Sequence, residues 1–134
     1  MTKKSSYFFD FVYYYLPVLL WMGLIFYLSS ISGLKSGTSS IPLEIFLRKS
    51  AHIFEYLIFS FLVWRVFYFK FGLSLFRANV ATMIFCFLYA SSDEIHQFFV
   101  PDRSGQVVDV FVDMVGIFGG VIVGNSLARI NLKK

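Results

Sequence analysis

The side chains of this sequence that could carry out chemistry gather in a few short stretches. Two histidines and five carboxylates lie close together in the chain or at helical spacing. Histidine and carboxylate side chains provide either an acid–base pair or the ligands of a divalent metal ion. On this basis the sequence predicts the following catalytic residues: His52, Glu55, Asp93, Glu94, His96, Asp109 and Asp113.

Spacing indicates which of these side chains act together. Residues three or four positions apart lie on one face of a helix, so His52 and Glu55 share a polar face. Asp93 shares a second face with His96 and Gln97, three and four positions later. Asp109 and Asp113, four positions apart, form a third face. Three polar helix segments are therefore expected to converge on one shallow pocket.

Three further polar residues are predicted to bind a ligand: Lys49, Gln97 and Arg103. Arg103 stands in a polar turn, residues 101–105, that would cap the pocket. Its guanidinium group can hold a carboxylate or a phosphate through two hydrogen bonds, which makes it the natural partner for the acidic excess.

The cofactor remains open at this stage. Imidazole and carboxylate ligands suit zinc, manganese or magnesium. The sequence has no HExxH motif of the kind found in zinc proteases, and its spacing reveals no Ser-His-Asp arrangement. A divalent metal is thus one alternative, and an acid–base pair without metal is the other.

The composition places these residues in a membrane protein. Of the 134 residues, 57% are apolar and 21% aromatic, and only 15% are charged, whereas soluble domains contain about 25% charged residues. The net charge is +4, but the basic residues stand at the ends of apolar runs. This placement is typical of membrane proteins and argues against nucleic-acid binding. The lone Cys86 excludes an intrachain disulfide.

The expected fold is all-α, a single domain over residues 1–134 built as a bundle of four transmembrane helices. Apolar runs long enough to cross about 30 Å of hydrocarbon predict helices at residues 11–29, 49–69, 78–99 and 107–128. A loop is expected from Ser30 to Glu44. Pro17 would then lie near the start of the first helix, where a missing backbone donor is least disruptive.

The basic residues also predict an orientation. With an even number of helices both termini share one side of the membrane. That side has eight basic residues: Lys3, Lys4, Arg65, Lys70, Arg77, Arg129, Lys133 and Lys134. The other has four: Lys35, Arg48, Lys49 and Arg103. Because basic residues favour the cytoplasm, both termini are predicted there, in a multi-pass protein of the cell membrane whose polar residues face outward.

A glycine series on the last helix predicts close packing. Gly116, Gly120 and Gly124 recur every four residues, which lets a neighbouring backbone approach. They lie on the same stripe as Asp109 and Asp113, so this stripe should point into the bundle. A homo-oligomer formed through the same glycine face is the alternative.

Two stretches of the sequence resemble the VanZ-like family. They are RKSAHIFEY at residues 48–56 and SDEIHQFFVPDRSG at residues 92–105, the latter followed by Asp109, Asp113 and Gly116. The likeness extends from the first helix to the fourth. The chain departs from the usual Pro-Gly-Arg turn by having Asp102, and it has Asp113 where Asn is also frequent.

The resemblance implies a bacterial integral membrane protein, typical of Gram-positive cells, whose namesake is associated with low-level resistance to the glycopeptide teicoplanin. The working hypothesis is a protein that binds or modifies an envelope component and is linked to glycopeptide tolerance. Its expected partners are the bilayer and an envelope lipid or glycopeptide-related ligand. One alternative is a membrane-embedded hydrolase or transferase acting on a lipid-linked or phosphate-bearing substrate. Another is a non-enzymatic binding or scaffold protein.

Overall fold

The computed structural model describes residues 3–32, 40–101, 103 and 105–131, and all the long elements in this part of the chain are helices. The first rod consists of α1 (Lys3–Asp10), the wide π-helical turn η1 (Phe11–Tyr15) and α2 (Leu16–Ser30). The second consists of α3 (Ile41–Arg65) and η2 (Val66–Lys70). The last two are α4 (Leu75–Phe98) and α5 (Val107–Asn131).

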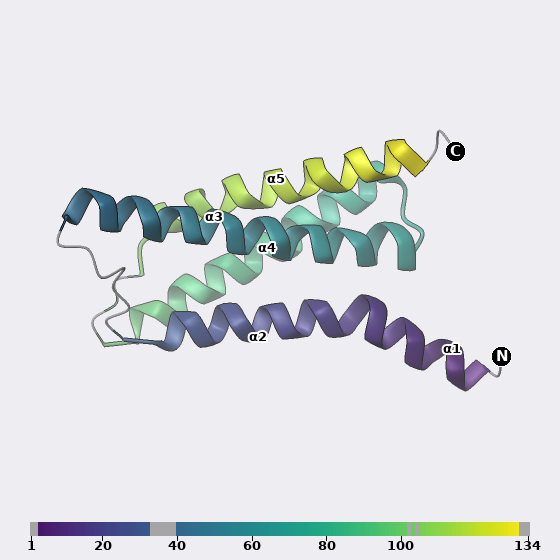
Figure 1. Ribbon diagram of the computed structural model, residues 1–134, viewed down its shortest axis with the longest axis horizontal. Helices are drawn as coiled ribbons and strands as arrows, with labels where there is room; N and C mark the ends of the chain where they lie inside the picture. The colour runs from purple at the N-terminus through teal and green to yellow at the C-terminus, as the bar shows by residue number, and fades with distance from the viewer. Residues whose placement is uncertain (1–2, 33–39, 102, 104, 132–134) are drawn as a thin grey trace.

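All four of these described rods are long and apolar enough to cross a membrane, which confirms the predicted bundle. The spans are Tyr7–Ser30, Ile41–Lys70, Leu75–Phe98 and Val107–Ile130. Successive rods run in opposite directions, so the start of α1 and the end of α5 lie at the same end of the bundle (Figure 1). Many phenylalanines face outward, among them Phe54 and Phe111, which are 67% and 68% exposed. Such a surface suits lipid rather than water.

Three helices begin earlier than predicted. The second helix begins at Ile41, and not at residue 49, because Pro42 occupies its first turn, where a proline is well tolerated. The third helix begins at Leu75 instead of residue 78. The first begins at Lys3, so Pro17 lies inside a long helical rod and not near its start. The wide turn η1 ends at Tyr15, two residues before Pro17, and a backbone bond from Leu16 N to Phe11 O closes it.

A glycine follows the end of the second rod. Gly72 adopts a φ of 64°, a left-handed conformation that favours glycine and commonly terminates helices. This turn places Ser74 at the N-cap of α4. The chain therefore reverses here within a few residues.

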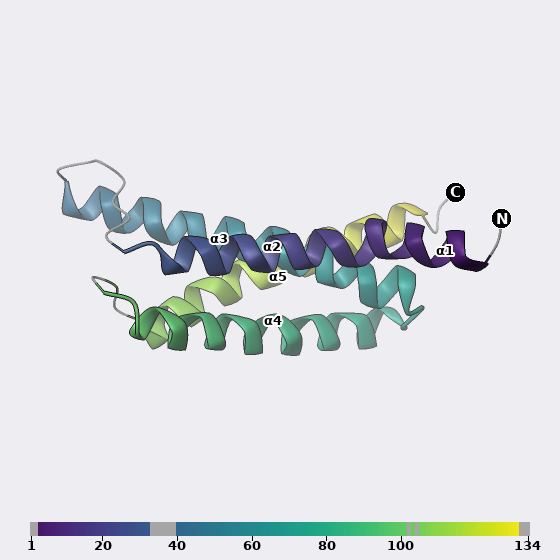
Figure 2. The ribbon, with the colours of Figure 1, turned by 90° about the horizontal axis from the view of Figure 1, so that it is seen from below.

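The closest helix pair is α3 with α5, which lie side by side in Figure 1. The predicted glycine series makes this contact. A Cβ atom at Gly116 would collide with the carbonyl oxygen of Ile53, and one at Gly124 would collide with the Trp64 ring. Packing within one chain thus accounts for the glycine face. In the orthogonal view of Figure 2, α4 runs along the opposite side of the bundle from α2 and α3.

Candidate functional site

The predicted site residues lie at the end of the bundle where α2 and α4 end and α3 and α5 begin (Figure 1). Six of these residues are at most 8% exposed: His52, Asp93, Glu94, Gln97, Asp109 and Asp113. They are enclosed by helices, and so lie deeper than the shallow pocket that was predicted. His52 and Glu55 also lie about three and four turns inside α3, because this helix begins at Ile41 and not at residue 49.

Three of the predicted catalytic residues meet at the centre, each from a different helix. His52 on α3, Glu94 on α4 and Asp113 on α5 place ligand-type atoms within 4.8 Å of one another. His52 Nδ1 and Asp113 Oδ1 are 3.0 Å apart, at hydrogen-bonding distance. We call these three residues the three-helix cluster. The helix spacing of four on α5 brings Asp113 into the bundle, as the glycine stripe predicted.

Glu94 also fixes the turn that leads into α5. Its Oε2 accepts a hydrogen bond of 2.8 Å from the backbone N–H of Gln106. Gly105 allows this approach, because a Cβ atom there would collide with the carbonyl oxygen of Glu94. The carboxyl group is therefore held beside the start of α5 by the backbone of the turn.

A second polar group lies on the opposite side of α4. Asp93 Oδ2 accepts hydrogen bonds from Ser29 Oγ at 2.8 Å and from Gln97 Nε2 at 2.9 Å. The predicted ligand-binding residue Gln97 thus holds Asp93, with which it shares a helix face. Ser29 was not predicted, since its position at the end of an apolar run resembled the start of a loop. The sequence gives no signal for this contact, because a serine at the end of a span does not indicate which helix it will face.

The remaining predicted residues lie around these two groups. His96 stands apart from the three-helix cluster: its Nε2 is 2.9 Å from Ser30 Oγ, and its ring stacks on Phe26 with 4.4 Å between centroids. Lys49 Nζ is 2.8 Å from Asp109 Oδ1. Glu55 is half-buried, and its backbone carbonyl oxygen accepts from Trp21 Nε1.

Arg103 does not pair with a carboxylate among the described residues, contrary to the predicted pairing. Its Nε and one terminal nitrogen donate to the carbonyl oxygens of Ile31 and Leu28, at 3.1 and 2.7 Å. A cation at the carboxyl end of α2 satisfies carbonyl groups that lack helical partners. Asp102 and Ser104 of the same turn, and Lys35, Lys133 and Lys134 of the orientation count, lie outside the described residues.

Between the rods, the described residues line two apolar hollows. One, of about 460 Å³, lies between α4 and α5 beside the cluster. Of the described residues lining it, Glu94 is the one with an ionisable side chain; the others are Phe87, Ser91, Ile95, Phe98, Phe99, Gly105, Val107, Val110 and Phe111. We call this hollow the α4–α5 groove.

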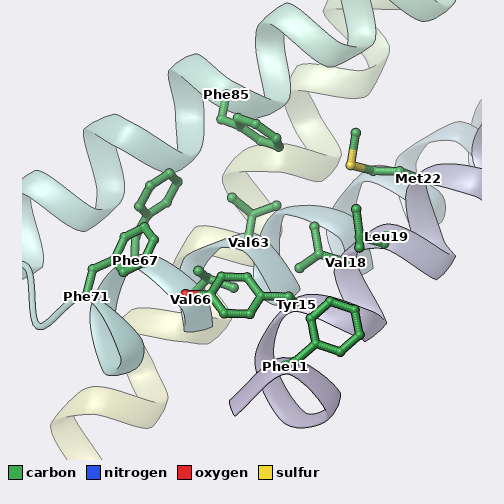
Figure 3. Close-up of a pocket in the computed structure, with 10 residues that line it drawn as sticks. All are labelled: Phe11, Tyr15, Val18, Leu19, Met22, Val63, Val66, Phe67, Phe71 and Phe85. Carbon is green, nitrogen blue, oxygen red and sulfur yellow. The ribbon is translucent and has the colours of Figure 1, made fainter. Parts of the chain in front are cut away.

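The other hollow, of about 500 Å³, lies towards the opposite end of the bundle. Figure 3 shows that its lining comes from the first rod, from the end of the second and, through Phe85, from α4. Carbon atoms of aromatic and aliphatic side chains dominate it: Phe11, Tyr15, Val18, Leu19, Met22, Val63, Val66, Phe67, Phe71 and Phe85. It offers apolar contact but few groups that could carry out a reaction.

Comparison with known proteins agrees with these features. No curated protein and no solved structure matches the chain. The sequence profile of the VanZ/LLP1 family matches residues 11–128, from the first rod to the last turns of α5. The matched residues include most of each of the four spans and every residue of the three-helix cluster. The chain therefore belongs to the VanZ/LLP1 family of membrane proteins.

Proposed function

We propose that this protein acts on a lipid-linked component of the bacterial envelope, and that the three-helix cluster is where it acts. One observation carries the proposal: the α4–α5 groove is lined mainly by apolar side chains, and Glu94 of the three-helix cluster is among its lining residues. A groove between two membrane spans is open to the lipid phase. A lipid-linked molecule can thus lay its chain against Phe98 and Phe111 while its polar end reaches Glu94.

The cluster has the groups that a hydrolase or transferase needs. A histidine held by a carboxylate is a general base or acid, and a second carboxylate beside it can accept or donate a proton. In this proposal His52 is the base, Asp113 orients its ring, and Glu94 is the general acid that gives a proton to the polar end of the substrate. The burial of all three excludes bulk water from the reacting groups, which strengthens their electrostatic effect.

A scaffold role is the second candidate, and the hydrogen bonds between helices favour it. Ser29 with Asp93, and Lys49 with Asp109, join neighbouring helices as structural contacts would. In this alternative the polar residues hold the bundle together and recognise a headgroup without reacting. The two candidate functions predict different effects on phenotype and on stability when the charge of Glu94 is removed.

Glu94→Gln separates them. The variant keeps the size of the side chain and an oxygen for the Gln106 N–H, so the bundle should unfold at an unchanged temperature. We expect it to fail to restore the phenotype of a deletion strain, since a general acid or base contributes about 10²–10⁴-fold to a rate. The measurements are teicoplanin susceptibility and envelope lipid composition.

Glu44→Gln is the matched control, because Glu44 lies in the first turn of α3, outside the cluster. It should restore the phenotype as the unaltered protein does. A loss in Glu94→Gln accompanied by unfolding would favour the scaffold. If deletion of the gene changed neither susceptibility nor lipid composition, the proposed function would be abandoned.

We also propose that the polar end faces the outside of a Gram-positive cell, with both termini in the cytoplasm. The basic-residue count and the shared end of α1 and α5 support this orientation. At the outer face, a change in an envelope component would lower the access of a glycopeptide such as teicoplanin to its target.

A reporter enzyme that is active only on the outer side of the cell membrane tests this orientation. Inserted after Lys35 it should be active, and fused after Lys134 or inserted after Gly72 it should be inactive. Activity of the fusion after Lys134 would reverse the orientation and place the three-helix cluster near the cytoplasm.

A further inference from the structure

We infer that His52, Glu94 and Asp113 bind one divalent cation. The inference extends the proposed function, because it names an ion that would take part in substrate binding at the same site. The biological role of the ion therefore rests on the proposed function. Binding of the ion can nevertheless be measured without any substrate. Its first support is geometric: three helices each contribute one ligand-type atom, and these atoms lie within 4.8 Å of one another.

The unpaired carboxylate oxygens are the second support. Glu94 is 6% exposed and Asp113 is 0% exposed. Within the described part of the chain, Glu94 Oε1 and Asp113 Oδ2 have no hydrogen-bond partner. A buried carboxylate oxygen without a partner is costly and rare, and a bound ion is one of the few groups that can satisfy two such side chains together.

The charges around the three-helix cluster also favour a bound cation. Asp93 is buried nearby on α4, so three carboxylates and one histidine share this part of the bundle. The neighbouring cations serve other groups: Lys49 contacts Asp109, and Arg103 donates to carbonyl oxygens of α2. A divalent cation would offset the excess negative charge, whose burial in a membrane is otherwise unfavourable.

The same charges bear on the substrate. A phosphate-bearing headgroup would be repelled by Glu94 and Asp113 alone. A cation held between these carboxylates reverses the local sign and can polarise a phosphoryl or carbonyl oxygen as a Lewis acid. We therefore expect the lipid-linked substrate to present an anionic group, such as a phosphate, to the ion.

The donor set favours zinc or manganese over calcium. One imidazole nitrogen and two carboxylate oxygens are ligands that both ions accept, whereas calcium takes six to eight oxygens. Zinc ligands stand about 2.0–2.2 Å from the ion and therefore about 3–4 Å from one another. The 3.0 Å between His52 Nδ1 and Asp113 Oδ1 lies in this range, and the ion would replace the hydrogen bond between these two atoms. Glu94, whose ligand atom lies within 4.8 Å of the other two, would move closer on binding. Three protein ligands leave a position open for substrate or water.

Metal content tests the inference directly. The full chain is purified in detergent, stripped with a chelator, equilibrated separately with Zn²⁺ or Mn²⁺, desalted and analysed by elemental mass spectrometry. We expect about one equivalent per chain with one of these ions. Glu94→Gln should lower this content by about tenfold or more, because even the loss of an outer-shell partner costs about 10–100-fold in affinity.

Each ligand has a matched control in the chain. Glu55→Gln is the control for Glu94→Gln, and Asp109→Asn, on the same helix, is the control for Asp113→Asn. His96→Ala is the control for His52→Ala, and these two are the histidines of the sequence. The three control variants should keep the metal content of the unaltered protein.

Thermal unfolding with and without the ion keeps the test decisive if a variant folds poorly. The ion should raise the unfolding temperature of the unaltered protein, because it binds the folded state alone. It should not raise that of Glu94→Gln, which retains the contact between His52 and Asp113. Failure of the unaltered protein to retain either ion, or full retention by Glu94→Gln, would overturn the inference.

The outcome is separable from that of the proposed function. If the cluster binds the ion but deletion of the gene has no effect on susceptibility or lipids, the proposed function fails and the metal site stands. If Glu94→Gln abolishes the phenotype but no ion binds, the metal site fails and an acid–base role without metal stands.

Discussion

Gly120→Ala is expected to lower the free energy of unfolding by about 2–3 kcal/mol, although it adds only one methyl group. A Cβ atom at this position would collide with the carbonyl oxygen of Leu57 and with Ser60 Oγ, and it would lie 2.8 Å from the backbone nitrogen of Phe61. The serine hydroxyl can rotate, but the backbone atoms belong to α3. They can move only if α3 and α5 separate, which weakens the closest helix contact in the bundle.

The neighbouring Gly119 provides the control. A Cβ atom there would meet only the flexible side chain of Leu57, at 3.2 Å. Gly119→Ala should therefore leave stability unchanged or raise it by up to about 1 kcal/mol, because alanine favours a helix over glycine by this amount. Both variants are compared by denaturant or thermal unfolding in the same detergent. Equal effects of the two would contradict the packing of α5 on α3 through Gly120.

The helices could be predicted because composition and apolar length determine them. Hydrocarbon imposes one requirement, that backbone polar groups bond internally, and a long apolar run can meet it only as a helix. The helix boundaries were harder to predict, because proline occurs both in loops and in the first turn of a helix. Pro42 looked like part of a loop but occupies the first turn of α3, and Pro17 looked terminal but lies within the first rod.

Residues of the site could be predicted within one helix but not between helices. Spacing placed Asp93 and Gln97 on one face, and the structure joins them by a hydrogen bond of 2.9 Å. The same reasoning grouped Asp93 with His96, which instead contacts Ser30 on α2. Adjacent residues in a helix point in different directions, so Glu94 reaches the turn before α5 while Asp93 reaches α2.

Partners from other helices depend on the order in which helices pack, which spacing does not specify. Ser29 is the clearest example, because a serine at the end of a span gives no indication that it will contact Asp93. Arg103 is another. Its sequence context suggested an acidic partner, but the guanidinium group instead donates to the carbonyl oxygens of Ile31 and Leu28 at the end of α2.

His52→Leu is expected to destabilise the protein by about 3 kcal/mol when a chelator removes any bound ion. Asp113 is 0% exposed, and the imidazole is the partner of its Oδ1 at 3.0 Å. Removing the partner leaves a buried carboxylate unpaired in the bundle. Asp113→Leu should cost less, about 1–3 kcal/mol, because a neutral imidazole is easier to bury alone.

The double variant His52→Leu/Asp113→Leu should be more stable than the sum of the single effects predicts, by about 1–2 kcal/mol. Two apolar side chains of similar size can fill the same space without an unpaired charge. The same cycle on Lys49 and Asp109 is the comparison. There the lysine side chain is 33% exposed, so we expect a coupling below about 1 kcal/mol.

Unfolding of all six variants in detergent with chelator measures both couplings. Additive effects at His52 and Asp113 would mean that the two side chains do not interact in the folded bundle. A double variant that matches the unaltered protein in stability would show that this buried pair is not needed to hold α3 against α5. The presence of the pair would then have to be explained by what the site binds, because a leucine pair would serve the fold equally well.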